Sequence, residues 1–460
     1  MIPAINETHD PAARSWVESA NQAGCDFPIQ NLPFGVFRKT RGQERVGVGV
    51  AIGDQVLDLA EAAERGLFSG DETSPKTGHV FTYGGPLAHQ AALARGAALL
   101  CLVPNLNPLM MLGEQHWSAL RRSIFHLLRH DSSVDRERVP LYPMTDVEML
   151  LPAQVGDYTD FYASIYHAEK VGSMFRPDNP LLPNYKWLPV AYHGRASSLL
   201  PSGIPIRRPR GQTRSDPTQP PVFTPSQRLD YEAEVGFFVG PGNALGEPIP
   251  IAQAERHIFG LCLVNDWSAR DVQTWEYQPL GPFLSKSFAT TISPWVVTLE
   301  ALAHYRTRAF PREDADSRLL PHLNDSGDQQ YGGLDLTVEV WLNSNKMRQL
   351  GIGPIRLSRG STADLYWTMA QMLTHHASNG CNLRPGDLLA SGTISGAAKD
   401  ARGCLLELTA GGKEPITLPN GEQRGFLEDG DEVILRGYCE RKGAARIGFG
   451  ECRAVVLPAT

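Results

Sequence analysis

Two glutamates in the middle of the chain have a spacing that suits metal binding. The segment LDYEAEVGFFVG, residues 229–240, places Glu232 and Glu234 two positions apart. On a strand both side chains project from one face, and neighbouring carboxylates repel each other unless a positive charge lies between them. A hard divalent cation with oxygen ligands satisfies both groups. A solvated strand face is the ordinary alternative, although the apolar residues 237–239 favour burial.

A third acidic residue follows an apolar run. Residues 258–264 predict a buried strand that ends at Asp266, and an acid at a strand end is a common metal ligand or catalytic residue. If a short helix follows, Arg270 and Gln273 lie one turn apart. Such a pair could hold a carboxylate or a developing oxyanion. The alternative is that Asp266 is simply a turn or cap residue.

A third segment, DYTDFYASIYHAEKVGSMFR, is rich in potential ligands and proton donors. Its polar candidates are Asp160, Tyr162, His167 and Arg176. Histidine is the commonest general base, but a single histidine is more often structural. We interpret His193, His375 and His376 as structural, since the adjacent pair would point to different faces of a helix. The chain contains no P-loop, no GxGxxG after a strand, no GxSxG and no HExxH, which disfavours nucleotide-dependent, serine-hydrolase and zincin chemistry.

These candidates require a scaffold that is mostly β. Residues 45–60 predict two short strands around a Gly53-Asp54 turn. Helical periodicity follows over residues 86–103 and 114–129. We therefore expect a small β domain with an extension and helices over residues 1–150, and a catalytic domain over residues 151–460.

Within the second region, apolar residues alternate over positions 334–342, which is typical of a half-buried strand. A capping box at Ser361–Asp364 predicts a helix with Leu365, Met369 and Met372 on its apolar face, ending at residues 379–380. Residues 305–333 are polar and irregular and predict a surface insertion.

Bulk properties limit the class of protein. A length of 460 residues suggests two or three domains. The net charge of −7 argues against a nucleic-acid surface. Seven dispersed cysteines without CxxC spacing indicate reduced thiols. No signal peptide is visible and no stretch is apolar enough to span a membrane, so we expect no membrane partner and a cytoplasmic location.

Several long motifs resemble one known family. They are YHGRASSLLPSGIPIRRP, NDWSARD, PLGPFLSKSF, NGCNLRPGDLLASGTISG and FLEDGDEV. Together they make the chain similar to the fumarylacetoacetate hydrolase family from about residue 31 to residue 459. The resemblance implies a small SH3-like N-terminal domain, a large C-terminal β-roll and a homodimer. It also implies a metal-dependent hydrolase that cleaves 4-fumarylacetoacetate to fumarate and acetoacetate, the last step of tyrosine and phenylalanine breakdown.

The same resemblance implies roles for individual residues. Ligands of a divalent ion, Mg²⁺ or Ca²⁺, fall on Asp160, Glu232, Glu234 and Asp266. A second cation site involves Asp266, Lys286 and Thr290. A catalytic dyad falls on His167 and Glu407, with Arg270 and Lys286 beside the reacting carbonyl. Substrate contacts fall on Tyr162, Arg176, Gln273, Tyr277 and Thr393.

Two departures and two alternatives stay open. The loop between Thr393 and Glu407 carries Lys399 and Arg402 where relatives are more acidic, and about the first twenty-five residues form an extension without a counterpart. One alternative keeps the metal core but changes the substrate, as in acylpyruvate hydrolases or oxaloacetate decarboxylases. The other is a non-catalytic protein that binds a metal and a diketo acid.

Overall fold

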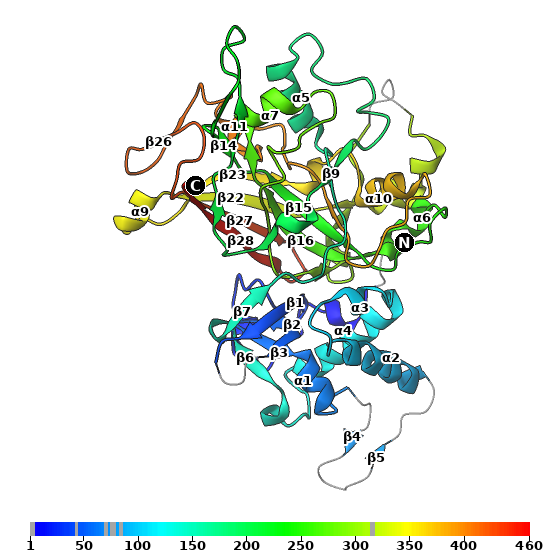
Figure 1. The fold of residues 1–460 in the computed structure, drawn as a ribbon. Helices are drawn as coiled ribbons and strands as arrows, with labels where there is room; N and C mark the ends of the chain where they lie inside the picture. The colour runs from blue at the N-terminus through cyan, green and yellow to red at the C-terminus, as the bar shows by residue number, and fades with distance from the viewer. Residues whose placement is uncertain (1–4, 42–44, 69–71, 74–79, 82–85, 313–317) are drawn as a thin grey trace.

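The computed structural model describes residues 5–41, 45–68, 72–73, 80–81, 86–312 and 318–460. The early part of the chain forms a smaller body with its own sheet and helices, and the later part forms a larger body built mainly from strands (Figure 1). The expectation of a mainly β fold with some helix is confirmed.

The smaller body is built on a five-stranded antiparallel sheet in the order β6-β3-β2-β1-β7. Its strands are β1 (Phe34–Lys39), β2 (Val46–Ile52), β3 (Gln55–Asp58), β6 (Leu141–Pro143) and β7 (Val147–Leu150). The predicted turn at Gly53 is confirmed, since its φ of 57° lies in the left-handed region between β2 and β3. The α-helices among the described residues of this body are α1 (Leu59–Glu64), α2 (Pro86–Leu100), α3 (Asn107–Met110) and α4 (Glu114–Leu128).

The larger body contains two main sheets. The first includes the path β10-β18-β16-β15-β24-β8-β9, with β19 paired to β16. Its strands are β8 (Tyr158–Phe161), β9 (Ala191–Gly194), β10 (Leu199–Pro201), β15 (Ala233–Val239), β16 (Ile258–Asp266), β18 (Thr290–Ile292), β19 (Val297–Thr298) and β24 (Leu388–Ala390). Both β15 and β16 are buried along their whole length, so their apolar runs, residues 235–239 and 258–264, reflect strands covered on both faces.

The second sheet has the order β11-β28-β27-β22-β23 and packs against the first through β16, β27 and β28. Its strands are β11 (Ile206–Arg207), β22 (Thr337–Asn343), β23 (Ile355–Ser361), β27 (Glu432–Cys439) and β28 (Ile447–Leu457). The strand predicted from alternation is present as β22. The two sheets approach so closely that a Cβ added to Gly437 would lie 2.5 Å from Leu263 Cδ2.

Shorter elements connect these sheets. The helices of the larger body are α5 (Ile165–Phe175), α6 (Ile251–Ala254), α7 (Arg270–Glu276), α8 (Ser326–Tyr331), α9 (Asn345–Gln349), α10 (Met369–Ala377) and α11 (Leu405–Leu408). The two-stranded pairs in the chain are β4 (Glu72–Thr73) with β5 (Val80–Phe81), β12 (Arg210–Thr213) with β13 (Val222–Pro225), β14 (Leu229–Asp230) with β17 (Ser268–Ala269), β20 (Arg306–Thr307) with β21 (Gly333–Leu334), and β25 (Ile416–Thr417) with β26 (Gln423–Arg424).

Two local predictions were wrong in part. Ser361 caps only a 3-10 turn at Thr362–Asp364, and α10 begins seven residues later than predicted, behind its own capping box of Thr368 and Gln371. The segment 305–333 is more than a surface insertion, because Tyr305 and Leu323 belong to the core and α8 lies within it. Its residues 313–317 lie outside the described part of the chain.

The N-terminal extension joins the two bodies. The Asn6 amide donates to Glu300 Oε1 (2.8 Å), and His9 Nε2 lies 2.7 Å from the Glu300 carbonyl oxygen. The buried Arg121 of α4 donates to Thr8 Oγ1 at 3.2 Å. Residues 6–9 therefore connect α4 of the smaller body to the segment after β19 of the larger one.

Candidate active site

Four carboxylates on or next to three strands of one sheet converge at one point of the larger body. Asp160 lies in β8, Glu234 in β15 and Asp266 at the end of β16, and Glu232 immediately precedes β15. All four are buried, and one oxygen from each lies within 4.8 Å of the others. The sequence predicted strand positions for Glu232, Glu234 and Asp266 but none for Asp160, and the pairing within one sheet brings all four together.

Part of this cluster has the properties expected of a cation site. Both carboxylate oxygens of Glu234 and Oδ1 of Asp160 are buried without a hydrogen-bond partner in the described part of the chain. Burial and the nearby Asp160 and Asp266 raise the pKa of Glu234 well above its usual value. Burial and Asp266 do the same to the pKa of Asp160. Hard oxygen ligands that lack protein partners fit a divalent cation such as Mg²⁺ or Ca²⁺.

Two cationic side chains stand at the other side of the cluster. Lys286 Nζ contacts Glu232 Oε2 and lies 3.0 Å from Asp266 Oδ2, and Arg270 Nη1 lies 2.7 Å from Glu232 Oε1. Although burial raises the pKa of Glu232, the charges of Lys286 and Arg270 outweigh this effect and hold that pKa below its ordinary value. An ammonium group has three donors and no acceptor, so any ligand from Lys286 would be its backbone carbonyl.

Asp266 is oriented by two hydroxyl groups. Thr290 Oγ1 donates to Asp266 Oδ1 (2.6 Å), and the Tyr192 hydroxyl donates to Asp266 Oδ2 (2.8 Å). Tyr192 lies directly opposite Asp160 in the pairing of β8 with β9. Tyr192 lies in the motif YHGRASS but was not among the predicted site residues, because only the strand pairing shows that its hydroxyl group reaches the acidic cluster.

A histidine–glutamate pair lies on two short helices. His167 is in the first turn of α5, whose N-cap Ser164 accepts from the His167 backbone N–H (3.3 Å). His167 Nδ1 is 2.7 Å from Glu407 Oε2 on α11. The same oxygen accepts from Ser395 Oγ (2.8 Å) and from Cys404 Sγ (3.2 Å). Burial raises the pKa of Glu407, but His167 and these donors outweigh burial and lower it.

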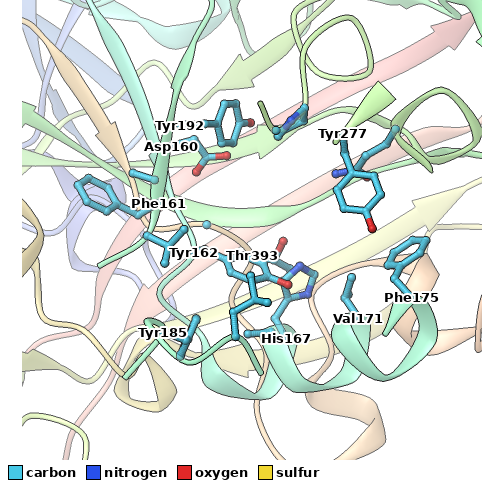
Figure 2. Close-up of a pocket in the computed structure, with 18 of the residues that line it drawn as sticks. Asp160, Phe161, Tyr162, His167, Val171, Phe175, Tyr185, Tyr192, Tyr277 and Thr393 are labelled. Atoms are coloured by element: carbon cyan, nitrogen blue, oxygen red, sulfur yellow. The ribbon is translucent and has the colours of Figure 1, made fainter. Parts of the chain in front are cut away.

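The remaining candidates surround a cavity of about 550 Å³. The residues expected to contact substrate, all of which line it, are Tyr162, Arg176, Gln273, Tyr277 and Thr393. His167, Asp160 and Glu232 also contribute to its wall. Figure 2 shows His167, Val171 and Phe175 projecting from one helix, with Tyr277 facing Phe175.

Several polar atoms of the cavity residues have unused hydrogen-bonding capacity. Thr393 Oγ1 and Arg176 Nε are buried without a partner within the described residues. Arg270 Nη1 donates to Gln273 Oε1 (3.1 Å), one turn along α7 as the spacing predicted. A cavity with unpaired donors and three cationic lining residues, Arg176, Arg270 and Lys286, suits a small dicarboxylate.

The three histidines interpreted as structural, His193, His375 and His376, do not line this cavity. His376 Nε2 is 2.9 Å from Thr159 Oγ1, and the rings of His193 and His376 are 6.3 Å apart. Burial lowers the pKa of both His375 and His376. His193 and His376 lie beside Thr159 of β8, and the structural interpretation of all three histidines stays a prediction.

Two known protein families match most of the chain. Residues 158–457 match the model described as fumarylacetoacetate (FAA) hydrolase C-terminal, and residues 30–152 match fumarylacetoacetase N-terminal. The chain belongs to the fumarylacetoacetate hydrolase family. Among relatives, it is 49% identical to the fumarylacetoacetases of Bos taurus and Homo sapiens, over 94% of this chain and 97% of each relative. It is 45% identical to the fumarylacetoacetase of Arabidopsis thaliana, over 94% of this chain and 96% of that relative.

Proposed function

We propose that this protein hydrolyses a carbon–carbon bond of 4-fumarylacetoacetate and releases fumarate and acetoacetate. The observation that carries the proposal is the position of His167, whose Nδ1 is held by Glu407 and whose Nε2 lies 4.0 Å from Glu232 Oε1 at the cavity wall. A base therefore stands beside the acidic cluster in one cavity. The 49% sequence identity to fumarylacetoacetases, over nearly the full length of the chain, supports fumarylacetoacetate as the substrate.

The proton transfers follow from this geometry. His167 Nε2 takes a proton from a water molecule, whose oxygen attacks the fumaryl carbonyl carbon. Glu407 fixes the tautomer with Nδ1 protonated and stabilises the imidazolium that forms. The bond to the central CH₂ then breaks, its electron pair stays with the acetoacetate fragment, and the proton on Nε2 is available to convert that CH₂ to CH₃. No serine or cysteine nucleophile is needed.

The charged and polar side chains around the cavity stabilise and position the reactants. Arg270 and Lys286 donate to the oxyanion that forms during attack, and Gln273 holds Arg270 in place. Arg176 and the hydroxyl groups of Tyr162, Tyr277 and Thr393 bind the substrate's carboxylates and carbonyls.

We assign Asp160, Glu232, Glu234 and Asp266 as the ligands of a divalent cation, and Mg²⁺ or Ca²⁺ as that cation. When bound, it supplies Lewis-acid polarisation of the diketone oxygens. The support is the all-oxygen donor set and the unpaired, buried oxygens of Glu234. Asp266 and Thr290, with the backbone of Lys286, are proposed to complete a second cation site, supported by the Thr290–Asp266 hydrogen bond.

The test is direct assay of purified protein for loss of the diketone ultraviolet absorbance of 4-fumarylacetoacetate, beside an acylpyruvate and oxaloacetate. We expect kcat/KM for fumarylacetoacetate to exceed the others by at least about 100-fold, because the cavity donors can pair with both of its carboxylates. Preferential turnover of an acylpyruvate or of oxaloacetate would overturn the substrate assignment. Binding without turnover would favour a non-catalytic role.

Three further assignments belong to this proposal. We place the domain boundary near residue 150. In support, the N-terminal family match ends at residue 152 and the C-terminal match begins at residue 158.

We propose a homodimer, supported by the exposed apolar side chains of Leu280, Phe283 and Leu284 on one loop. Sedimentation velocity tests it: a monomer at micromolar concentration contradicts the homodimer.

We also propose a cytoplasmic location. Its support is that all seven cysteines are unpaired, as in a reducing compartment. Within the described residues, none of the helices has the length and apolar character that crossing a bilayer demands. Microscopy of a fluorescent fusion protein tests the location.

A further inference from the structure

A buried aspartate that belongs neither to the acidic cluster nor to the His167–Glu407 pair connects two parts of the active site. Asp230, the last residue of β14, is fully buried. Its Oδ1 accepts from the backbone N–H groups of Tyr231 (2.9 Å) and Leu405 (2.8 Å). Its Oδ2 accepts from the backbone N–H of Leu406 (3.0 Å) and from Arg270 Nε (2.9 Å). One carboxylate thus accepts four hydrogen bonds from three separate segments.

Two of these bonds fix the start of α11, the helix that carries Glu407. The first N–H groups of a helix have no partner within it and are usually satisfied by the side chain of the N-cap residue. The N-cap of α11 is Cys404, which makes no side-chain capping bond. Asp230 supplies that function from 175 residues away in the sequence. The position of the Glu407 carboxylate therefore depends on Asp230.

The fourth bond fixes the guanidinium of Arg270. With Nε held by Asp230, its Nη1 lies 2.7 Å from Glu232 Oε1. Its Nη2 is buried and has no partner among the described residues, and Arg270 lines the cavity. The planar guanidinium has a fixed fork geometry, so fixing Nε and Nη1 also sets the direction in which Nη2 can donate.

We propose that Asp230 is a positioning residue that sets Glu407 and Arg270 at a constant separation. Through Glu407 it positions the His167 base, and through Arg270 it positions a donor to the oxyanion. His167 and Arg270 can therefore act on the same carbonyl group. This inference rests on the proposed hydrolase function. An acceptor-only side chain is required, because all four partners are donors.

The main test is Asp230→Asn, which keeps the size but replaces one acceptor oxygen with an NH₂ donor. We expect kcat to fall about 10- to 100-fold, as for an active site misaligned by a fraction of an ångström to 1 Å, with KM changed less than about threefold and bound metal unchanged. If this variant does not fold, Asp230→Glu retains the carboxylate while displacing it, and the same kcat loss is expected. Wild-type kcat in either folded variant would overturn the inference.

A matched control separates positioning from stability. Asp431 is also fully buried and accepts from Arg424 Nε (2.8 Å) and from the Glu428 backbone N–H (2.9 Å), but it does not line the cavity. Asp431→Asn should lower the melting temperature and leave kcat unchanged. If Asp431→Asn slows the reaction as much as Asp230→Asn, the effect is general destabilisation and the inference fails.

Two measurements complete the design. In the pair Asp230→Asn and Glu407→Gln, the combined loss of kcat should be smaller than the product of the two single losses, because Asp230 acts partly through Glu407 and partly through Arg270. Fully additive losses would contradict this coupling. Amide hydrogen exchange over residues 404–410 should accelerate in Asp230→Asn and stay slow in Asp431→Asn. Exchange requires no substrate, so this measurement is independent of the proposed function. If exchange accelerates in Asp230→Asn but the wild-type protein does not cleave fumarylacetoacetate, the proposed function is wrong and the link from Asp230 to α11 is still supported.

Discussion

His167 Nδ1 and Glu407 Oε2 lie 2.7 Å apart although 240 residues separate them in the chain. Because both are buried, the pair is a charge-assisted contact shielded from solvent. The neighbouring donors Ser395 and Cys404 hold the same oxygen and leave Glu407 little freedom to turn.

This contact predicts strongly non-additive kinetics. His167→Ala and Glu407→Gln should each lower kcat by roughly 10²–10⁴-fold, and the double variant should be little slower than His167→Ala. Metal content and substrate affinity should change far less. A double-mutant cycle on the cleavage rate is the measurement, and additive losses would show that the two residues act independently.

Removal of the metal should abolish activity and weaken the fold at neutral pH. Without a cation, the unpaired oxygens of Asp160 and Glu234 remain buried beside Asp266. A ligand present at about 100 times its Kd stabilises a folded protein by ~2.7 kcal/mol, which sets the expected scale of the loss. Chelation followed by elemental analysis, calorimetry and assay tests this, with Mg²⁺ or Ca²⁺ added back as control. Full activity in demonstrably metal-free protein would contradict it.

Glu234→Gln should weaken metal binding and stabilise the metal-free protein. The amide is nearly isosteric and removes a carboxyl group whose ionisation is opposed by burial and by Asp160 and Asp266. Excess metal should restore part of the rate, and the metal-free variant should melt above the metal-free wild type. Glu451→Gln, on the second sheet, is the control. No rate recovery in a folded variant would assign Glu234 another role.

His9 should make the fold sensitive to mild acid. Burial lowers the pKa of His9 from its usual 6.5, so as pH falls below 6.5 the unfolded chain takes up a proton that the folded chain resists. The free energy of unfolding therefore decreases from pH 6.5 down to the lower folded-state pKa. His9→Gln should cost about 1 kcal/mol at pH 8 and flatten this decrease. Urea unfolding across pH 5–8 measures it, with the exposed His130→Gln as control; parallel curves for wild type and His9→Gln would refute the assignment.

Local sequence pattern predicted the features that depend on near neighbours. Asp266 ends a buried strand, and Arg270 and Gln273 lie on one face of a short helix, as the spacing indicated. By contrast, α10 begins later than predicted because the Tyr366 backbone N–H bonds to the Ala163 carbonyl oxygen and Trp367 is fully buried, which keeps this stretch out of the helix. Tertiary contacts therefore determine that Thr368, and not Ser361, is the N-cap residue of α10.

Residues that act across the fold could not be found in this way. Tyr192 reaches Asp266 only through the pairing of β9 with β8, and Asp230 reaches Leu405 only through the assembled core. Nothing in the spacing of these residues signals such partners. Glu407 entered our expectations through the family resemblance, because its neighbours in sequence, CLLELT, are those of an ordinary buried helix.

The pairing of β8 with β24 also bears on how the protein is made. β8, which carries Asp160, pairs in parallel with β24, and the adjoining Asp157 N–H donates to Asp387, 230 residues later. At a translation rate of about 5–20 residues per second, β8 leaves the ribosome roughly 10–50 s before its partner exists. During that interval the edge of β8 that pairs with β24 has no partner strand, and the carboxylate of Asp160 is not yet buried. Any chain that terminates before residue 388 lacks this closing strand, so we expect truncated products to be recognised by chaperones and proteases rather than to persist as partially active enzyme.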